Sequence, residues 1–153
     1  MYLGIFSERL KDLMELEGTS IRALATKINV DRKSVRHWLQ GKHFPRYDAF
    51  VKLADYYQVG VDYLVGLDDG FLGASNLYTG EDALEKLRAN FLENLSNYMR
   101  EHNITRYALS RKLQIDQKPI TNWLKKGSMP EVGTLIKIAQ LMNCSLVSLL
   151  SHG

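Results

Sequence analysis

The chain has 153 residues, of which 45% are hydrophobic and 24% charged, and its formal net charge is +3. This composition is ordinary for a globular protein, and no apolar run approaches the ~20 residues of a membrane-spanning helix. We therefore expect a soluble, cytoplasmic protein that makes no membrane contact. Cys144 is the single cysteine, which excludes an internal disulfide, and we expect it to be a small core residue.

The first 66 residues have the apolar periodicity of α-helices. Residues 5–17 are predicted to form a helix that ends at Gly18. Its apolar face is expected to contain Phe6, Leu10, Leu13, Met14 and Leu16. Four further helices are predicted over residues 21–28, 32–40, 46–57 and 61–66, and Ser20 and Asp31 are the expected N-caps of the first two of these.

An acidic connector follows these helices. Residues 67–78 are predicted to be a loop, and Thr79 is predicted to cap a long helix over residues 80–102. The loop contains four apolar or aromatic residues, which are Phe71, Leu72, Leu77 and Tyr78. Two alternatives remain open for them: they cover the cores of the two domains, or they form a subunit interface.

The chain contains an internal repeat. Residues 6–66 recur as residues 91–151 at a constant offset of 85, with 15 identities in 61 positions. A repeat of this length indicates a duplicated domain. We therefore predict a first domain over residues 1–67, a linker over 68–79 and a second domain over 80–153. In the second domain Asp116 is the expected cap of the third helix.

Charge is distributed unevenly along this plan. Residues 1–66 carry a net charge of +2, residues 67–89 one of −3, and residues 90–153 one of +4. Two basic modules thus flank an acidic connector, which favours an anionic partner for the modules. Each module is near the lower size limit for a self-sufficient core. Packing of the halves on one another, or of two copies of the chain as a homodimer, would supplement such small cores.

Two segments carry the chemistry. Residues 22–41 read RALATKINVDRKSVRHWLQG, and residues 107–126 read YALSRKLQIDQKPITNWLKK. With their flanking helices they resemble the Xre/Cro-type helix-turn-helix domains of bacterial and phage repressors. The resemblance implies an all-α fold of two consecutive five-helix, lambda-repressor-like domains joined by a short loop and a long helix. The chain departs from the family pattern with Asn29 and Gln114 at the turn, Leu39 and Leu124 after the tryptophans, and Pro119.

In such a motif the start of the recognition helix meets base edges in the major groove. The candidate base-reading residues are Arg32, Lys33, Ser34, Arg36 and His37 in the first domain and Gln117, Lys118, Thr121 and Asn122 in the second. Arg and Lys suit guanine, whereas Gln and Asn suit adenine, so the domains are expected to read different half-sites. The candidate phosphate contacts are Ser20, Arg22, Lys42, His43, Arg46, Tyr47, Thr105, Arg106, Tyr107, Lys125, Lys126 and Ser128.

We therefore expect a sequence-specific double-stranded DNA-binding regulator, specifically a repressor of bacterial or phage origin. The alternative is a protein-interaction module, such as an antitoxin or a phage inhibitor, in which the second repeat binds a protein. No catalytic, metal or cofactor site is predicted, because the histidines are scattered and no phosphate-binding glycine loop occurs. No small-molecule ligand is evident either, and Trp38 and Trp123 are expected in the cores.

Overall fold

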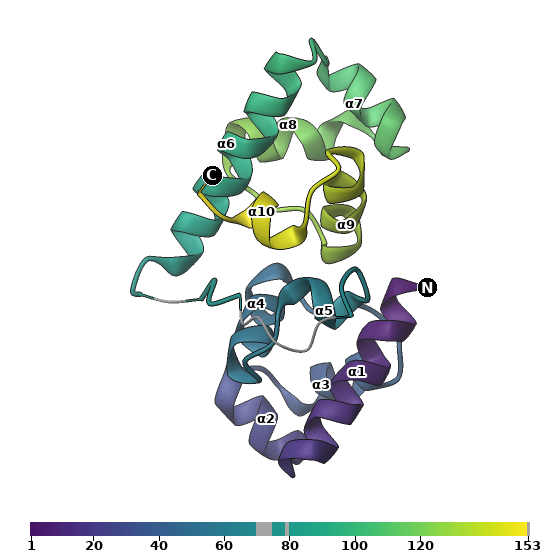
Figure 1. Cartoon of the computed structure of the whole chain (residues 1–153), viewed down its shortest axis with the longest axis vertical. Helices are drawn as coiled ribbons and strands as arrows, with labels where there is room; N and C mark the ends of the chain where they lie inside the picture. The colour runs from purple at the N-terminus through teal and green to yellow at the C-terminus, as the bar shows by residue number, and fades with distance from the viewer. Residues whose placement is uncertain (70–74, 79, 153) are drawn as a thin grey trace. The chain divides into compact units, whose positions relative to one another are not determined.

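Ten helices, and no strand, occur in the part of the chain that the structure describes, which is residues 1–69, 75–78 and 80–152 of a computed structural model. The chain divides into two units, Met1–Asn76 and Leu77–Gly153 (Figure 1). The first contains α1 (Tyr2–Glu17), α2 (Ile21–Ile28), α3 (Arg32–Leu39), α4 (Tyr47–Tyr56) and α5 (Val61–Val65). The second contains α6 (Ala83–Glu101), α7 (Arg106–Leu113), α8 (Gln117–Lys126), α9 (Val132–Leu141) and α10 (Leu146–Leu150). The predicted all-α fold with five helices in each domain is confirmed.

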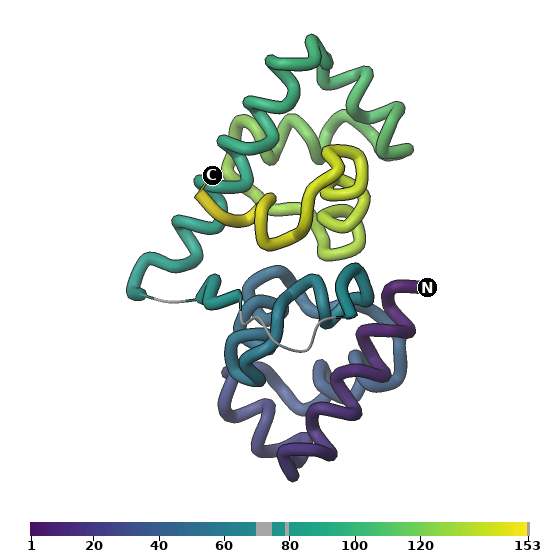
Figure 2. Tube along the Cα trace, viewed as in Figure 1, coloured from purple at the N-terminus to yellow at the C-terminus, as the bar shows by residue number. Residues whose placement is uncertain are grey.

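The repeat in the sequence is a repeat in structure. The bounds of α2, α4 and α5, moved by the offset of 85, are the bounds of α7, α9 and α10. Within each unit the Cα trace follows the same course of a long first helix and four shorter ones (Figure 2).

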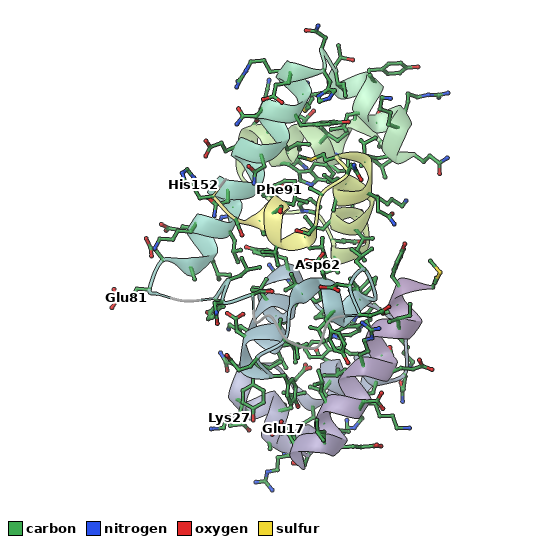
Figure 3. The ribbon with its side chains drawn as sticks, in the orientation of Figure 1. Glu17, Lys27, Asp62, Glu81, Phe91 and His152 are labelled. Atoms are coloured by element: carbon green, nitrogen blue, oxygen red, sulfur yellow. The ribbon has the colours of Figure 1, made fainter. Side chains whose placement is uncertain are left out.

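The repeated apolar positions form the two cores. In each domain the first helix packs on the third and the last, and the second helix packs on the third and fourth. Phe6 and its counterpart Phe91 are 0% and 1% exposed, and Figure 3 shows Phe91 within the second unit. Trp38 and Trp123 are buried, as predicted. These cores hold α3 and α8 in place while leaving their opposite faces to solvent.

Two predictions of burial and one of a helix start are wrong. Leu16 is 69% exposed, because at 100° per residue it lies at the margin of the face that contains the buried Leu10 and Leu13. Cys144 is only partly buried, in the turn that connects α9 to α10. The long helix begins at Ala83 after Asp82, rather than at residue 80; the predicted cap Thr79 lies outside the described residues, as do Phe71 and Leu72.

In each domain, a residue at the same position of the first helix donates hydrogen bonds to backbone carbonyl groups at the last helix. The Arg9 guanidinium donates to the carbonyl oxygen of Tyr63, in α5, and to that of Asp68. Its counterpart Asn94 donates through Nδ2 to the carbonyl oxygens of Leu149 and Ser151 at 2.8 and 2.9 Å. These side chains thus connect the first helix of each domain to backbone carbonyl groups in and just after the last helix.

The N-caps of the equivalent helices α3 and α8 differ. The Asp31 carboxylate accepts a hydrogen bond of 2.8 Å from the Ser34 backbone N–H, and hydrogen bonds from Ser34 hold the pKa of Asp31 below its usual 3.8. Asp116 makes no such bond. The counterpart of Ser34 is Pro119, which has no N–H to donate. Asp116 therefore occupies the N-cap position but does not make the predicted capping bond.

Asp31→Ala is expected to weaken the first domain more than Asp116→Ala weakens the second, because only Asp31 caps an N–H group. Since the folded pKa of Asp31 is lowered, its stabilisation is present above pH 3.8 and is lost as the pH falls through the folded value. Amide hydrogen exchange of α3 and α8 measures both effects. Equal protection losses in the two helices would contradict the assignment.

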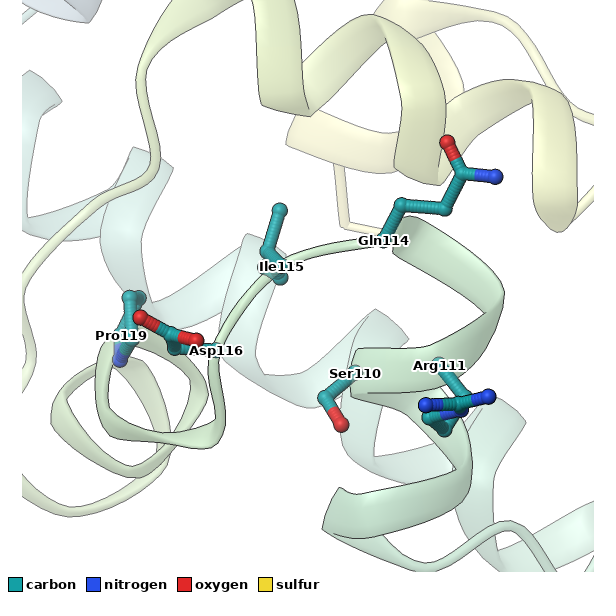
Figure 4. A pocket seen from close by; sticks show the side chains of 6 residues that line it. All are labelled: Ser110, Arg111, Gln114, Ile115, Asp116 and Pro119. Atoms are coloured by element: carbon teal, nitrogen blue, oxygen red, sulfur yellow. The ribbon is translucent and has the colours of Figure 1, made fainter.

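Both turns of the helix-turn-helix motifs adopt the left-handed conformation. Asn29 has φ 59° and ψ 53°, and Gln114 has φ 59° and ψ 44°. Asparagine tolerates this region better than most residues, whereas glutamine has the ordinary steric penalty. Figure 4 shows Gln114 and Ile115 at this turn, beside Asp116 and Pro119. The second domain therefore contains a strained turn that the first largely avoids.

Gln114→Gly is expected to raise the free energy of unfolding of the second domain by ~1 kcal/mol, because relief of left-handed strain exceeds the entropic cost of glycine. Asn29→Gly is the matched control and should give a smaller gain. Urea unfolding, followed by Trp123 fluorescence in a Trp38→Phe background, measures the change in the second domain. The control is read from Trp38 in a Trp123→Phe background, and equal gains in the two domains would contradict the argument.

Candidate nucleic-acid interface

In each domain two short helices meet across the left-handed turn, and the second of them is amphipathic. Val35 and Trp38 of α3 are 0% and 2% exposed, and the Ser7 hydroxyl of α1 donates to the Trp38 carbonyl oxygen at 2.5 Å. The corresponding inward residues of α8 are Ile120 and Trp123, which are also buried. Each second helix is thus fixed by its apolar face and presents its polar face to solvent.

The polar face of α3 is rich in cations. Arg32, Lys33 and Arg36 are exposed, whereas Ser34 and His37 are half-buried. Ser34 is involved in the cap with Asp31, through its side chain as well as its backbone. The predicted readers of the first domain therefore lie on one face, with three cations at its surface.

His37 belongs to a small cluster with the loop after α3. Its Nδ1 lies 3.3 Å from Nε2 of His43, and the two rings meet edge to face with centroids 5.3 Å apart. Partial burial, and then the charges of Lys42, His43 and Lys33, lower the pKa of His37 from 6.5. The lowered pKa favours the neutral imidazole, which has one donor and one acceptor nitrogen.

The polar face of α8 has fewer charges. Gln117 and Lys118 are exposed, whereas Thr121 and Asn122 are half-buried. Thr121 Oγ1 donates to the Gln117 carbonyl oxygen at 3.2 Å and accepts from Arg106 Nη1 at 3.3 Å. The sequence predicts a phosphate contact for Arg106 and a base contact for Thr121, and it does not predict the hydrogen bond between them. The substitution of Ile21 and Arg36 by Arg106 and Thr121 at the repeat offset was the signal that could have revealed it.

The predicted phosphate contacts lie at the starts of α2 and α7, after α3, and around the end of α8. Lys125 and Lys126 are predicted in the loop after the third helix, but they lie in the last turn of α8. Ser20 and Thr105 accept the capping N–H groups of Ala23 and Ala108, which leaves each hydroxyl hydrogen free for an acceptor. All the other members of this set are exposed except Tyr47, which is half-buried; they are Arg22, Lys42, His43, Arg46, Arg106, Tyr107, Lys125, Lys126 and Ser128. In each domain, donors thus lie at both ends of the motif.

Open pockets lie beside the turns. In the first domain Asn29, Ser34, His43 and Arg46 contribute to a pocket of ≈ 340 Å³. In the second domain the turn and the start of α8 line a pocket of ≈ 750 Å³, in which Figure 4 shows Arg111 near Ser110. Within the described residues, no cluster of three or more potential ligands could hold a metal ion, and no helix is long and apolar enough to cross a membrane.

Comparison with protein families agrees with this geometry. A family model described as a helix-turn-helix domain matches residues 5–64, and one described as a Cro/C1-type HTH DNA-binding domain matches residues 94–152. No curated protein and no solved structure matched the chain. The two matches cover the same tandem units that the repeat and the helices define. The chain therefore belongs to the helix-turn-helix DNA-binding regulators, as a tandem pair of Xre/Cro-type domains.

Proposed function

We propose that this chain is a sequence-specific transcriptional repressor that binds two unlike half-sites of one double-stranded operator and occludes a promoter. The observation that supports it is the pair of recognition helices, each anchored by a buried tryptophan and each presenting exposed polar side chains from its first turn. The N-terminal part of such a helix meets base edges, so residues of this turn are placed to specify sequence.

In this proposal α3 reads through Arg32, Lys33, Arg36 and His37, and α8 reads through Gln117, Lys118 and Asn122. The residues at the starts of α2 and α7, those after α3 and those at the end of α8 hold the phosphate backbone and set the register. Because both domains belong to one chain, docking of the second follows docking of the first as an intramolecular step.

The test is selection of bound fragments from random double-stranded DNA by the whole chain, followed by titration against the selected site at several salt concentrations. The proposal requires an enriched sequence and an affinity that falls steeply with salt. Repression is then tested with a reporter whose promoter overlaps the selected site. Enrichment without a change in reporter output would reject the repressor role, and no enrichment would favour the protein-interaction alternative.

Lys42→Ala is expected to weaken binding to all sequences alike and to lower the salt slope by about one unit, because one phosphate contact disappears. Lys86→Ala removes the same charge outside the proposed interface, where Lys86 pairs with Asp82 at 3.2 Å, and should leave the slope unchanged. Titrations at four salt concentrations measure both variants. A loss confined to one sequence would instead assign Lys42 to a base.

A further inference from the structure

At one pair of equivalent positions, the two domains carry an arginine on different helices. In the first domain Arg36 projects from the recognition helix α3, while Ile21 begins α2. At the offset of 85, Thr121 replaces Arg36 on α8, and Arg106 replaces Ile21 at the start of α7. The second domain therefore retains an arginine at this pair of positions, but it comes from the helix before the recognition helix.

The two residues of the second domain, Arg106 and Thr121, contact each other. Arg106 Nη1 donates to Thr121 Oγ1 at 3.3 Å, across the junction of α7 and α8. The Thr121 hydroxyl donates its own hydrogen to the Gln117 carbonyl oxygen at 3.2 Å. Because this hydrogen is committed within α8, the oxygen is oriented to accept from Arg106. Thr121 thus holds the guanidinium beside the recognition helix and uses one of its N–H donors.

Most of the guanidinium remains available for a ligand. A guanidinium has five N–H donors, of which one points to Thr121. Arg106 makes no other hydrogen bond or ion pair within the described residues, and its side chain is exposed. The four remaining donors include a complete two-donor edge, which matches the O6 and N7 acceptors of guanine in the major groove.

We propose that Arg106 reads a guanine in the second half-site and that Thr121 is the positioning residue that aims it. This inference rests on the proposed DNA-binding function and revises the expectation that Arg106 contacts phosphate and Thr121 contacts a base. A side chain anchored to the second turn of α8 is held near the part of the helix that meets base edges. A fixed fork suits bidentate base contact, for which geometry matters more than charge alone.

The first test uses the whole chain and the operator selected by the wild-type protein. Arg106→Ala should lower affinity by about 5- to 150-fold at that operator and relax the preference for guanine at one base pair. Arg106→Lys keeps the charge without the fork and should not restore that preference. If Arg106→Ala weakens all sequences equally, the residue is a phosphate contact, and the inference is overturned.

The second test separates positioning from folding. Thr121→Val removes the hydroxyl at similar shape and should reduce guanine preference, whereas Thr121→Ser should retain it. In an Arg106→Ala background Thr121→Val should have no further effect on preference, because the positioned group is gone. The same loss in both backgrounds would refute the positioning role. A wild-type chain that selects no sequence would refute the proposed function itself, and this result is distinct from one in which selection succeeds and the Arg106 variants behave as wild type.

Discussion

Arg32→Ala is expected to weaken binding of the whole chain to its preferred operator by ~1–3 kcal/mol, or about 5- to 150-fold, and to relax preference at one base pair. Arg32 is the first residue of α3, directly after the Asp31 cap, and its side chain is exposed. The cap orients the first turn, so the guanidinium leaves the helix at the end that enters the groove.

Arg32→Lys is the control that separates charge from geometry. It keeps the cation but loses the bidentate fork, so much of the sequence preference should still be lost while the salt slope stays close to that of the wild type. Competition titrations with operators mutated one base pair at a time measure the preference. Unchanged preference in Arg32→Ala would mean that α3 is not the reading helix.

The largest loss of operator affinity is expected from charge reversals that stop one domain from binding DNA while the chain stays intact. Lys33 and Lys118 are equivalent residues at the second position of α3 and α8, and both are exposed. Lys33→Glu or Lys118→Glu places a negative charge in the electronegative major groove, so each should remove one domain from the operator. Loss of the linked second docking should cost roughly 10²- to 10⁴-fold in affinity.

The two reversals should not be equal. The first domain presents Arg32 and Arg36 beside Lys33 on its recognition helix, whereas α8 presents Gln117 and Thr121 at those positions. Because electrostatic contact supplies most non-specific affinity, Lys33→Glu should cost more than Lys118→Glu. A negative charge in the first helical turn favours the helix, so both variants should remain folded. If Lys118→Glu binds as the wild type does, the second repeat is not a DNA reader at that site.

The fold was predictable because its determinants are local and repeated. Caps such as Ser20 and apolar residues at helical spacing can be identified directly along the chain. The repeat at an offset of 85 provides a second copy of each helix, against which each assignment can be checked. The errors arose where a residue's role depends on something not adjacent to it. Leu16 lies at the margin of an apolar face, where burial depends on which other helices pack beside it. The capping bond of Asp116 fails because of the proline three residues later.

The site was predictable as a set of positions but not as a set of contacts. Exposure of Arg32 and Lys33 follows from the inward direction of Val35 and Trp38 on the same helix. The bond between Arg106 and Thr121 joins two helices, and it depends on the angle at which those helices cross. That angle is set by core packing, which apolar spacing alone does not specify.

The exchange of an arginine between α3 and α7 has a consequence for the orientation of the protein on DNA. A dimer of identical subunits binds a palindrome and reads it identically from either end. A chain whose two reading surfaces place their guanidinium groups on different helices has no such symmetry. Its operator would have two different half-sites, and the protein would bind it in one orientation along the DNA. A single molecule could then distinguish the upstream side of a promoter from the downstream side.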